Sequence, residues 1–213
     1  MEIAAQCFRT ESELVEYAIP LLSRHFGSEF DISTEVAVGR SVADVVLVFP
    51  RQGRISTAYP LTVTESVVLS TLRSMGRSTR IDILESRCGL NRRELRNGGL
   101  DRLVDERLVQ MGRGGKVSSR AFSRWAKILA FEAKLEKWRS ALRQAVTYRS
   151  FADLSYVLIP SENAKHAIAQ IDSFRSSGVG LLTVEENAIK THARAVRSYD
   201  HNWKREYLVS RLL

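Results

Sequence analysis

Charged residues inside and at the end of apolar runs are the first sign of chemistry in this chain of 213 residues. Residues 128 to 134 read Ile-Leu-Ala-Phe-Glu-Ala-Lys, an apolar run typical of a buried strand that ends on a carboxylate and an ammonium. Side chains at positions i and i+2 of a strand share a face, so Glu132 and Lys134 are expected to project together. Asp44 interrupts a second apolar run, residues 42 to 48. Such charge is costly unless it is paired or used, which makes these three residues a candidate site.

The types of these residues indicate metal-assisted hydrolysis of a phosphate ester. If the two strands are neighbours in one sheet, Asp44 and Glu132 form a site of hard oxygen ligands suited to Mg²⁺ or Mn²⁺. A metal-bound water is easier to deprotonate. The ammonium of Lys134 can orient that water or stabilise the charge that builds on a phosphodiester in the transition state.

The rest of the chain predicts helices and strands that would position this site. Helical apolar spacing predicts a helix over residues 11 to 26, kinked or divided at Pro20, and Gly39-Arg40 is a plausible turn between two strands. Beyond the strand near residues 126 to 133, further elements follow: helices over about 135 to 149, 161 to 174 and 203 to 212, and strands over 155 to 159 and 179 to 184. This order predicts an α/β fold.

The arrangement resembles the PD-(D/E)XK nuclease superfamily, which has the restriction-endonuclease-like fold. Asp44 matches the first carboxylate, although Ala43 stands before it in place of proline, and Glu132-Ala133-Lys134 matches the Glu-x-Lys motif. The resemblance implies a mixed sheet flanked by helices. It also implies Mg²⁺ or Mn²⁺ held by Asp44, Glu132 and the backbone carbonyl of Ala133, with Lys134 as a catalytic residue.

The same resemblance implies roles for residues on two helices. Members of the family frequently carry a glutamate on the N-terminal helix, and Glu13 is the candidate here, with Glu11 and Glu16 as rivals. Gln144 and Tyr148 look like the Gln-x-x-x-Tyr element of the RecB-like branch, whose side chains face the site or the DNA.

A structural explanation of these residues stays open beside the catalytic one. Asp44 and Lys134 could form an ion pair that only stabilises the fold, with Glu132 at a solvent-exposed strand end. Glu13 could simply favour the first turn of its helix. The polar pair on the later helix could be structural as well.

A basic segment lies between the strand of the first carboxylate and the strand of the second. Residues 61 to 120 contain twelve Lys or Arg and seven Asp or Glu, a net charge of +5. The pattern predicts three helices and a hairpin whose tip, residues 111 to 115, is rich in glycine. Asn91 and Glu94 have the spacing of a capping box at the start of the third helix. This order resembles a winged helix-turn-helix.

The sequence therefore predicts a discontinuous α/β core, residues 1–60 and 120–213, with a winged helix-turn-helix inserted at residues 61–119. In that fold the third helix enters the major groove and the wing touches the DNA backbone. The expected DNA-binding residues are Arg92, Arg93 and Arg96 on the helix, and Arg113 and Lys116 on the wing. Winged helices also dock proteins or form dimers, with arginines as a solubilising face.

Composition favours an anionic partner. The formal net charge of +8 and a sequence pI of about 9.8 point to nucleic acid ahead of a membrane surface. The two cysteines lack the spacing of zinc ligands, so the sequence does not indicate a zinc site, and neither a signal sequence nor a membrane-length apolar run is recognised. The expected location is the cytoplasm, the expected partner is DNA with no membrane, and a homodimer is possible.

The sequence thus predicts a Mg²⁺-dependent deoxyribonuclease that hydrolyses phosphodiester bonds and binds duplex DNA through the inserted domain. The alternative is a non-catalytic DNA-binding or regulatory protein that uses a nuclease-like core as a scaffold or dimer interface.

Overall fold

The structure, a computed structural model, describes residues 8–27, 29–50, 59–119, 126–199 and 202–212. These residues belong to two compact units. Unit 1 combines residues 1–50 with residues 127–200, and unit 2 combines residues 51–126 with residues 201–213.

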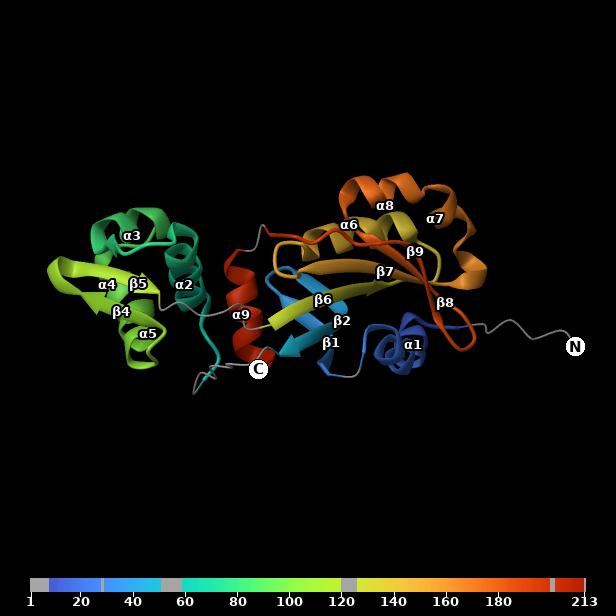
Figure 1. Cartoon of the computed structure of the whole chain (residues 1–213), viewed down its shortest axis with the longest axis horizontal. Coiled ribbons are helices and arrows are strands. Elements are labelled where there is room, and N and C mark those ends of the chain that lie inside the picture. Colours follow the sequence, from blue (N-terminus) through green and yellow to red (C-terminus); the bar gives the residue numbers. More distant parts are fainter. Residues whose placement is uncertain (1–7, 28, 51–58, 120–125, 200–201, 213) are drawn as a thin grey trace, which may run out of the picture. The chain divides into compact units, whose positions relative to one another are not determined.

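Unit 1 is a mixed six-stranded sheet flanked by helices, so the α/β class is confirmed (Figure 1). In their order across the sheet, the strands are β1 (Asp31–Val38), β2 (Ser41–Pro50), β6 (Ala126–Ala133), β7 (Leu154–Pro160), β8 (Gly180–Val184) and β9 (Ile189–Ala193). Strands β6, β7 and β8 are parallel, whereas the β1–β2 and β8–β9 pairs are antiparallel. Strand β6 is buried along almost its whole length, as expected for a central strand covered on both faces.

Helices cover both faces of this sheet. Helix α1 (Glu11–Phe26) buries one apolar stripe, which includes Leu14, Ala18 and Leu22, against strand residues such as Leu47 and Phe131. On the opposite side lie α6 (Trp138–Tyr148), α7 (Lys165–Ala169) and α8 (Ile171–Ser177) (Figure 1). Because successive side chains of a strand point to opposite faces, β2 and β6 direct one set of side chains toward α1 and the other toward α6.

Two predicted helices differ in detail from the observed ones. Helix α1 continues through Pro20 without division. Pro20 lies on the exposed side of the helix, where water can bond the carbonyl that proline leaves without a donor. The predicted helix over residues 161 to 174 consists instead of a 3₁₀ turn, η3 (Ser161–Asn163), followed by the separate helices α7 and α8.

Unit 2 contains helices and a three-stranded antiparallel sheet in the order β3-β5-β4. Its elements are α2 (Val63–Met75), β3 (Thr79–Arg80), α3 (Ile81–Cys88), α4 (Arg92–Leu95), the π-helical turn η1 (Arg96–Leu100), α5 (Asp101–Asp105), β4 (Val109–Gly112), the 3₁₀ turn η2 (Arg113–Gly115), β5 (Lys116–Ser119) and α9 (Trp203–Leu212). Helices α4 and α5 are joined through η1 without a break.

Two local predictions for unit 2 are confirmed. The Asn91 side chain accepts a hydrogen bond from the Glu94 N–H at 2.9 Å, and the Glu94 carboxylate accepts one from the Asn91 N–H at 2.9 Å, which is the capping box. The hairpin of β4 and β5 closes on Gly114 and Gly115, both with a φ of 69°. Such positive values favour glycine, because a Cβ would be strained there.

The C-terminal helix differs from the sequence-based division, which assigns residues 120–213 to the core. Helix α9 packs on α2 and belongs to unit 2. The Leu61 N–H donates to the Ser210 hydroxyl at 3.0 Å, and Arg73 forms an ion pair with Glu206. Sequence order carries no information on which unit a terminal helix covers. Helix α9 buries side chains such as Leu208 and contacts α2 of unit 2.

Candidate active site

The predicted carboxylates lie on neighbouring strands. Asp44 belongs to β2 and Glu132 to β6, and the two strands are adjacent in the sheet. Because Val45 and Phe131 point into the core beneath α1, the alternation of a strand sends Asp44 and Glu132 toward the opposite face, where α6 lies. An oxygen of Asp44, Oδ2, accepts a hydrogen bond of 2.7 Å from the backbone N–H of Ala133, which fixes it beside the Glu-x-Lys motif.

Glu132 is the most buried charged group of the site, with 1% of its surface exposed. Its Oε2 accepts a hydrogen bond from the Tyr148 hydroxyl. Its Oε1 forms an ion pair with Lys134 and lies 3.1 Å from Nζ. Burial raises the pKa of the Glu132 carboxyl above its ordinary value, and the charge of Asp44 raises it further; Tyr148 and Lys134 oppose this change.

Tyr148 anchors Glu132 from α6. Its hydroxyl oxygen also lies 2.5 Å from the backbone carbonyl oxygen of Val42, at the start of β2. Burial, together with the bond to Glu132, raises the pKa of Tyr148 well above its ordinary value. The hydroxyl therefore stays protonated and acts as a donor that holds the carboxylate in place.

Lys134 forms a bridge between two glutamates. Its Nζ lies 2.7 Å from Glu11 Oε2 and 3.1 Å from Glu132 Oε1. Burial by itself lowers the pKa of this lysine, but pairing with Glu11 and Glu132 and the charge of Asp44 outweigh burial, so the pKa is raised. Lys134 is thus an ammonium at neutral pH and cannot serve as a general base in this arrangement.

Asp44 remains easier to protonate than an ordinary aspartate. Burial raises its pKa most, the Ala133 N–H and Lys134 lower it, and the charges of Glu11 and Glu35 raise it. Glu35 stands at the position of β1 that the antiparallel register places opposite Asp44. It is exposed and has a φ of 52°, uncommon for a residue with a Cβ. Sequence reasoning missed Glu35, because only the hairpin register places it there.

The structure brings Glu11 to the site in place of Glu13. Glu13 lies in the cap of α1: its N–H donates to the Thr10 hydroxyl at 3.1 Å, and its carboxylate accepts from the Arg9 N–H at 2.7 Å. A sequence signal for this role exists, since Thr10 and Glu13 have the spacing of a capping box. Glu11, an expected rival, is the N-terminal glutamate that pairs with Lys134.

The Gln-x-x-x-Tyr pair divides in the same way. Tyr148 is buried and contacts Glu132, whereas Gln144 is exposed and its side-chain oxygen lies 3.5 Å from the Ser140 hydroxyl. The structural alternative is also incorrect in one respect, since Glu132 is buried rather than at a solvent-exposed strand end. The ion pairs of Lys134 are with the two glutamates.

The donor set fits a hydrated hard cation better than a closed protein cage. No group of three or more His, Cys, Asp or Glu within the described ranges is arranged to hold a metal ion. Asp44 retains one oxygen without a hydrogen bond from a described residue, and one oxygen of Glu132 faces the Lys134 ammonium. Mg²⁺ is usually bound by one or two carboxylates together with waters and substrate phosphate, which is what two such oxygens offer.

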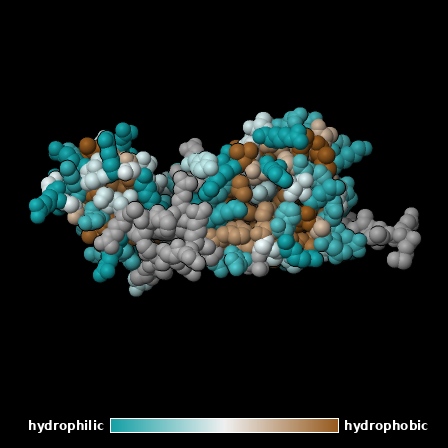
Figure 2. Space-filling model, viewed as in Figure 1, coloured by the Kyte–Doolittle hydropathy of each residue, from teal (hydrophilic) through white to brown (hydrophobic). Residues whose placement is uncertain are grey.

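The predicted DNA-binding residues are all exposed on unit 2. Arg92 and Arg93 lie in α4, Arg96 begins η1, and Arg113 and Lys116 flank the tip of the β4–β5 hairpin. In the space-filling view, hydrophilic residues are interspersed with more apolar ones on the visible face of unit 2 (Figure 2). Arg92 is 3.7 Å from Glu85, and for the part of the chain described here the other four have no carboxylate within ion-pair distance.

Comparison of the chain with protein-family models, curated proteins and solved structures found no significant match. Over the ranges that the structure describes, none of the helices combines the length and the apolar character needed to cross a membrane.

Proposed function

We propose that this protein is a metal-dependent deoxyribonuclease whose unit 1 has the restriction-endonuclease-like fold of the PD-(D/E)XK superfamily. One observation carries the proposal. Glu132 is almost completely buried, and both the Lys134 ammonium and the Asp44 carboxylate of the adjacent strand lie beside it. Two carboxylates brought together at a largely buried site cost stability, so a divalent cation that binds both is a good reason for their presence.

Each residue then has a defined task. Asp44 and Glu132, together with the Ala133 carbonyl, would hold Mg²⁺ or Mn²⁺, which supplies an activated water and Lewis-acid stabilisation of the phosphodiester when bound. Tyr148 fixes the orientation of Glu132 through its hydroxyl. Lys134, as an ammonium, can stabilise the negative charge that develops on the phosphate oxygens.

Unit 2 supplies duplex affinity in this proposal. The order α2, α3, then α4 to α5, followed by the β4–β5 hairpin, supports a winged helix-turn-helix. Its third helix starts with Arg92 and Arg93, so the exposed cations stand at the end that would enter a major groove. Replacing Arg93 and Arg96 by alanine should lower the slope of log affinity against log salt by about 1.8 for duplex DNA. Arg24→Ala, on α1 of unit 1, is the control with an unchanged slope.

The nuclease proposal is tested by Mg²⁺- and Mn²⁺-dependent cleavage of plasmid, linear duplex and single-stranded DNA. Asp44→Asn, Glu132→Gln and Lys134→Ala should each lower the rate about 10²-fold or more, the loss typical of removing a group that stabilises transition-state charge. Asp31→Asn, which changes an exposed carboxylate of β1, should cleave normally. Full cleavage by both Asp44→Asn and Glu132→Gln would contradict the proposal.

A second function has one observation in its favour. The ammonium of Lys134 is already paired with Glu11 as well as Glu132, a network that can be purely structural. The protein would then be a non-catalytic DNA-binding or regulatory protein with unit 1 as a scaffold or dimer interface. Tight duplex binding without cleavage under either metal ion would favour this function.

A further inference from the structure

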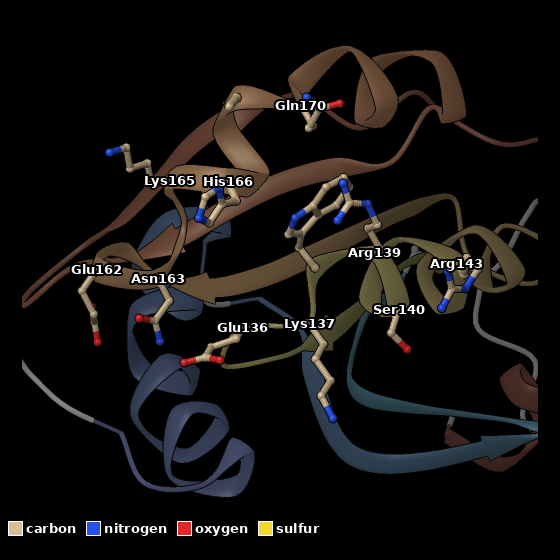
Figure 3. A pocket seen from close by; sticks show the side chains of 12 residues that line it. Glu136, Lys137, Arg139, Ser140, Arg143, Glu162, Asn163, Lys165, His166 and Gln170 are labelled. Carbon is tan, nitrogen blue, oxygen red and sulfur yellow. The ribbon is translucent and has the colours of Figure 1, made fainter.

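A basic cleft lies on unit 1. It has a volume of about 1020 Å³ and lies between the entry and first turns of α6 and the segment formed by η3 and α7. Figure 3 shows Lys137, Arg139 and Arg143 contributed by the α6 side, and Lys165 and His166 contributed by α7. All five side chains are exposed.

The lining of this cleft carries more positive than negative charge. Glu136 and Glu162 are the two acidic residues in its lining. None of the five basic side chains forms an ion pair with a carboxylate of the described residues. The Arg139 guanidinium lies over the Trp138 ring at 4.5 Å, which holds one cation at the wall. A concave surface with an excess of one sign of charge concentrates counter-ions of the opposite sign.

The cleft also lies at the end of the sheet that commonly binds ligands. Lys137 follows Lys134 by three residues, and Glu162 follows the end of β7 by two. In open α/β sheets, ligands bind beyond the carboxyl ends of the parallel strands, here β6 and β7. Helix α6 begins at this place without a side-chain cap and without an acidic residue in its first turn, which adds to the attraction for anions.

We propose that this cleft binds the sugar-phosphate backbone of a single nucleic-acid strand that leads to the carboxylate and lysine site. The inference rests on the proposed function, because it names the substrate that this site receives. Cations on both walls suit a chain of phosphates better than one phosphate, and grooves that follow a single strand combine such charge with little sequence readout. The volume is at the upper limit of small-molecule pockets, which leaves room for a few nucleotides.

The test measures binding of the full chain to a fluorescent 20-nucleotide oligothymidylate and to a duplex of the same length, in EDTA so that no cleavage occurs. The variant is Arg143→Glu with Lys165→Glu. Its affinity for the single strand should fall about tenfold or more, and its slope of log affinity against log salt should decrease by about 1.4, as expected for two lost phosphate contacts. Duplex affinity should change less than threefold. Arg24→Glu, an exposed arginine on α1, is the matched control and should bind as the unchanged protein does.

Several outcomes would overturn the inference. These are unchanged single-strand affinity in the double variant, an equal loss in Arg24→Glu, an equal loss for the duplex, or displacement of the oligonucleotide by pyrophosphate or polyglutamate at equal charge concentration. Arg143→Gln with Lys165→Gln repeats the measurement should charge reversal impair folding, which thermal unfolding will report.

The proposal of a strand-binding cleft and the proposal of nuclease activity can be refuted separately. Cleft-dependent strand binding without any Mg²⁺- or Mn²⁺-dependent cleavage would support the cleft and refute the nuclease. Metal-dependent cleavage of a single strand that is equally fast in Arg143→Glu with Lys165→Glu would refute the cleft and leave the nuclease intact.

Discussion

Replacing Asp44 by asparagine should stabilise the metal-free protein at neutral pH. Burial raises the pKa of Asp44, so the folded state disfavours its charged form. At a pH below the ordinary aspartate pKa of 3.8, Asp44 is protonated in both the folded and the unfolded chain, so its charge has no effect on stability. As the pH rises through 3.8, Asp44 ionises first in the unfolded chain, so the free energy of unfolding falls. Once Asp44 is ionised in the folded state as well, this loss of stability stays constant.

Asparagine removes this cost and still accepts the Ala133 N–H through its carbonyl oxygen. Substitutions that relieve a strained functional site commonly add about 0.5–2 kcal/mol to the free energy of unfolding. For a chain of this length, 1 kcal/mol corresponds to about 2–4 °C in melting temperature. We therefore expect Asp44→Asn to melt a few degrees higher than the unchanged protein in EDTA at pH 7, and this gain should disappear below about pH 4.

Magnesium should reduce this difference in stability. A ligand at ten times its Kd stabilises the folded state by about 1.4 kcal/mol. The unchanged protein should gain this stabilisation, and Asp44→Asn, which lacks one carboxylate ligand, should gain much less. Calorimetric unfolding in EDTA and in MgCl₂ measures both effects, with Asp31→Asn on β1 as the control. Destabilisation by Asp44→Asn in EDTA, or equal Mg²⁺ stabilisation of both proteins, would refute the reasoning.

Three further predictions concern the partners of the site and the terminal helix. Tyr148→Phe removes the hydroxyl that donates to Glu132, so denaturant unfolding should show a loss of about 1.5–3 kcal/mol, the range for hydrogen bonds to charged groups; unchanged stability would show that the bond is unimportant. Glu11→Gln should lower the pKa of Lys134, measured by NMR of the Lys134 Nζ, whereas Glu13→Gln should leave this pKa unchanged. An equal effect of the two substitutions would contradict the assignment of Glu13 to the helix cap. Deletion of residues 203–213 should lower the melting temperature of unit 2 and leave that of unit 1 unchanged, measured by calorimetry; a lower melting temperature of unit 1 alone would contradict the packing of α9 on α2.

Local features of the sequence predicted the strands of the site and several turns. The apolar run before Glu132 predicted the central strand β6, and alternation predicted that Glu132 and Lys134 would approach each other, as their 3.1 Å ion pair shows. The capping box of Asn91 and the glycines of the β4–β5 hairpin were likewise predictable. Each of these features depends on residues close together in the chain, whose local conformational preferences agree with the final fold.

The choice among residues on one helix depended on packing instead. Glu11 and Glu13 both lie in the first turn of α1, and only the docking of that helix on the sheet decides which one reaches Lys134. Gln144 and Tyr148 have the spacing of one helix face, yet the docking of α6 buries the tyrosine and leaves the glutamine exposed. Periodicity defines a stripe of side chains but not its rotation against a neighbour.

The sequence by itself determined the kind of residues at the site, the strands that carry them and the order of helices and strands, because these follow from side-chain type and short-range spacing. Only the tertiary structure decided that Tyr148 holds Glu132, that α9 belongs to unit 2, and that α6 and α7 line a basic cleft. These features join residues distant in the chain, and their contacts exist only after apolar burial has fixed how the elements pack.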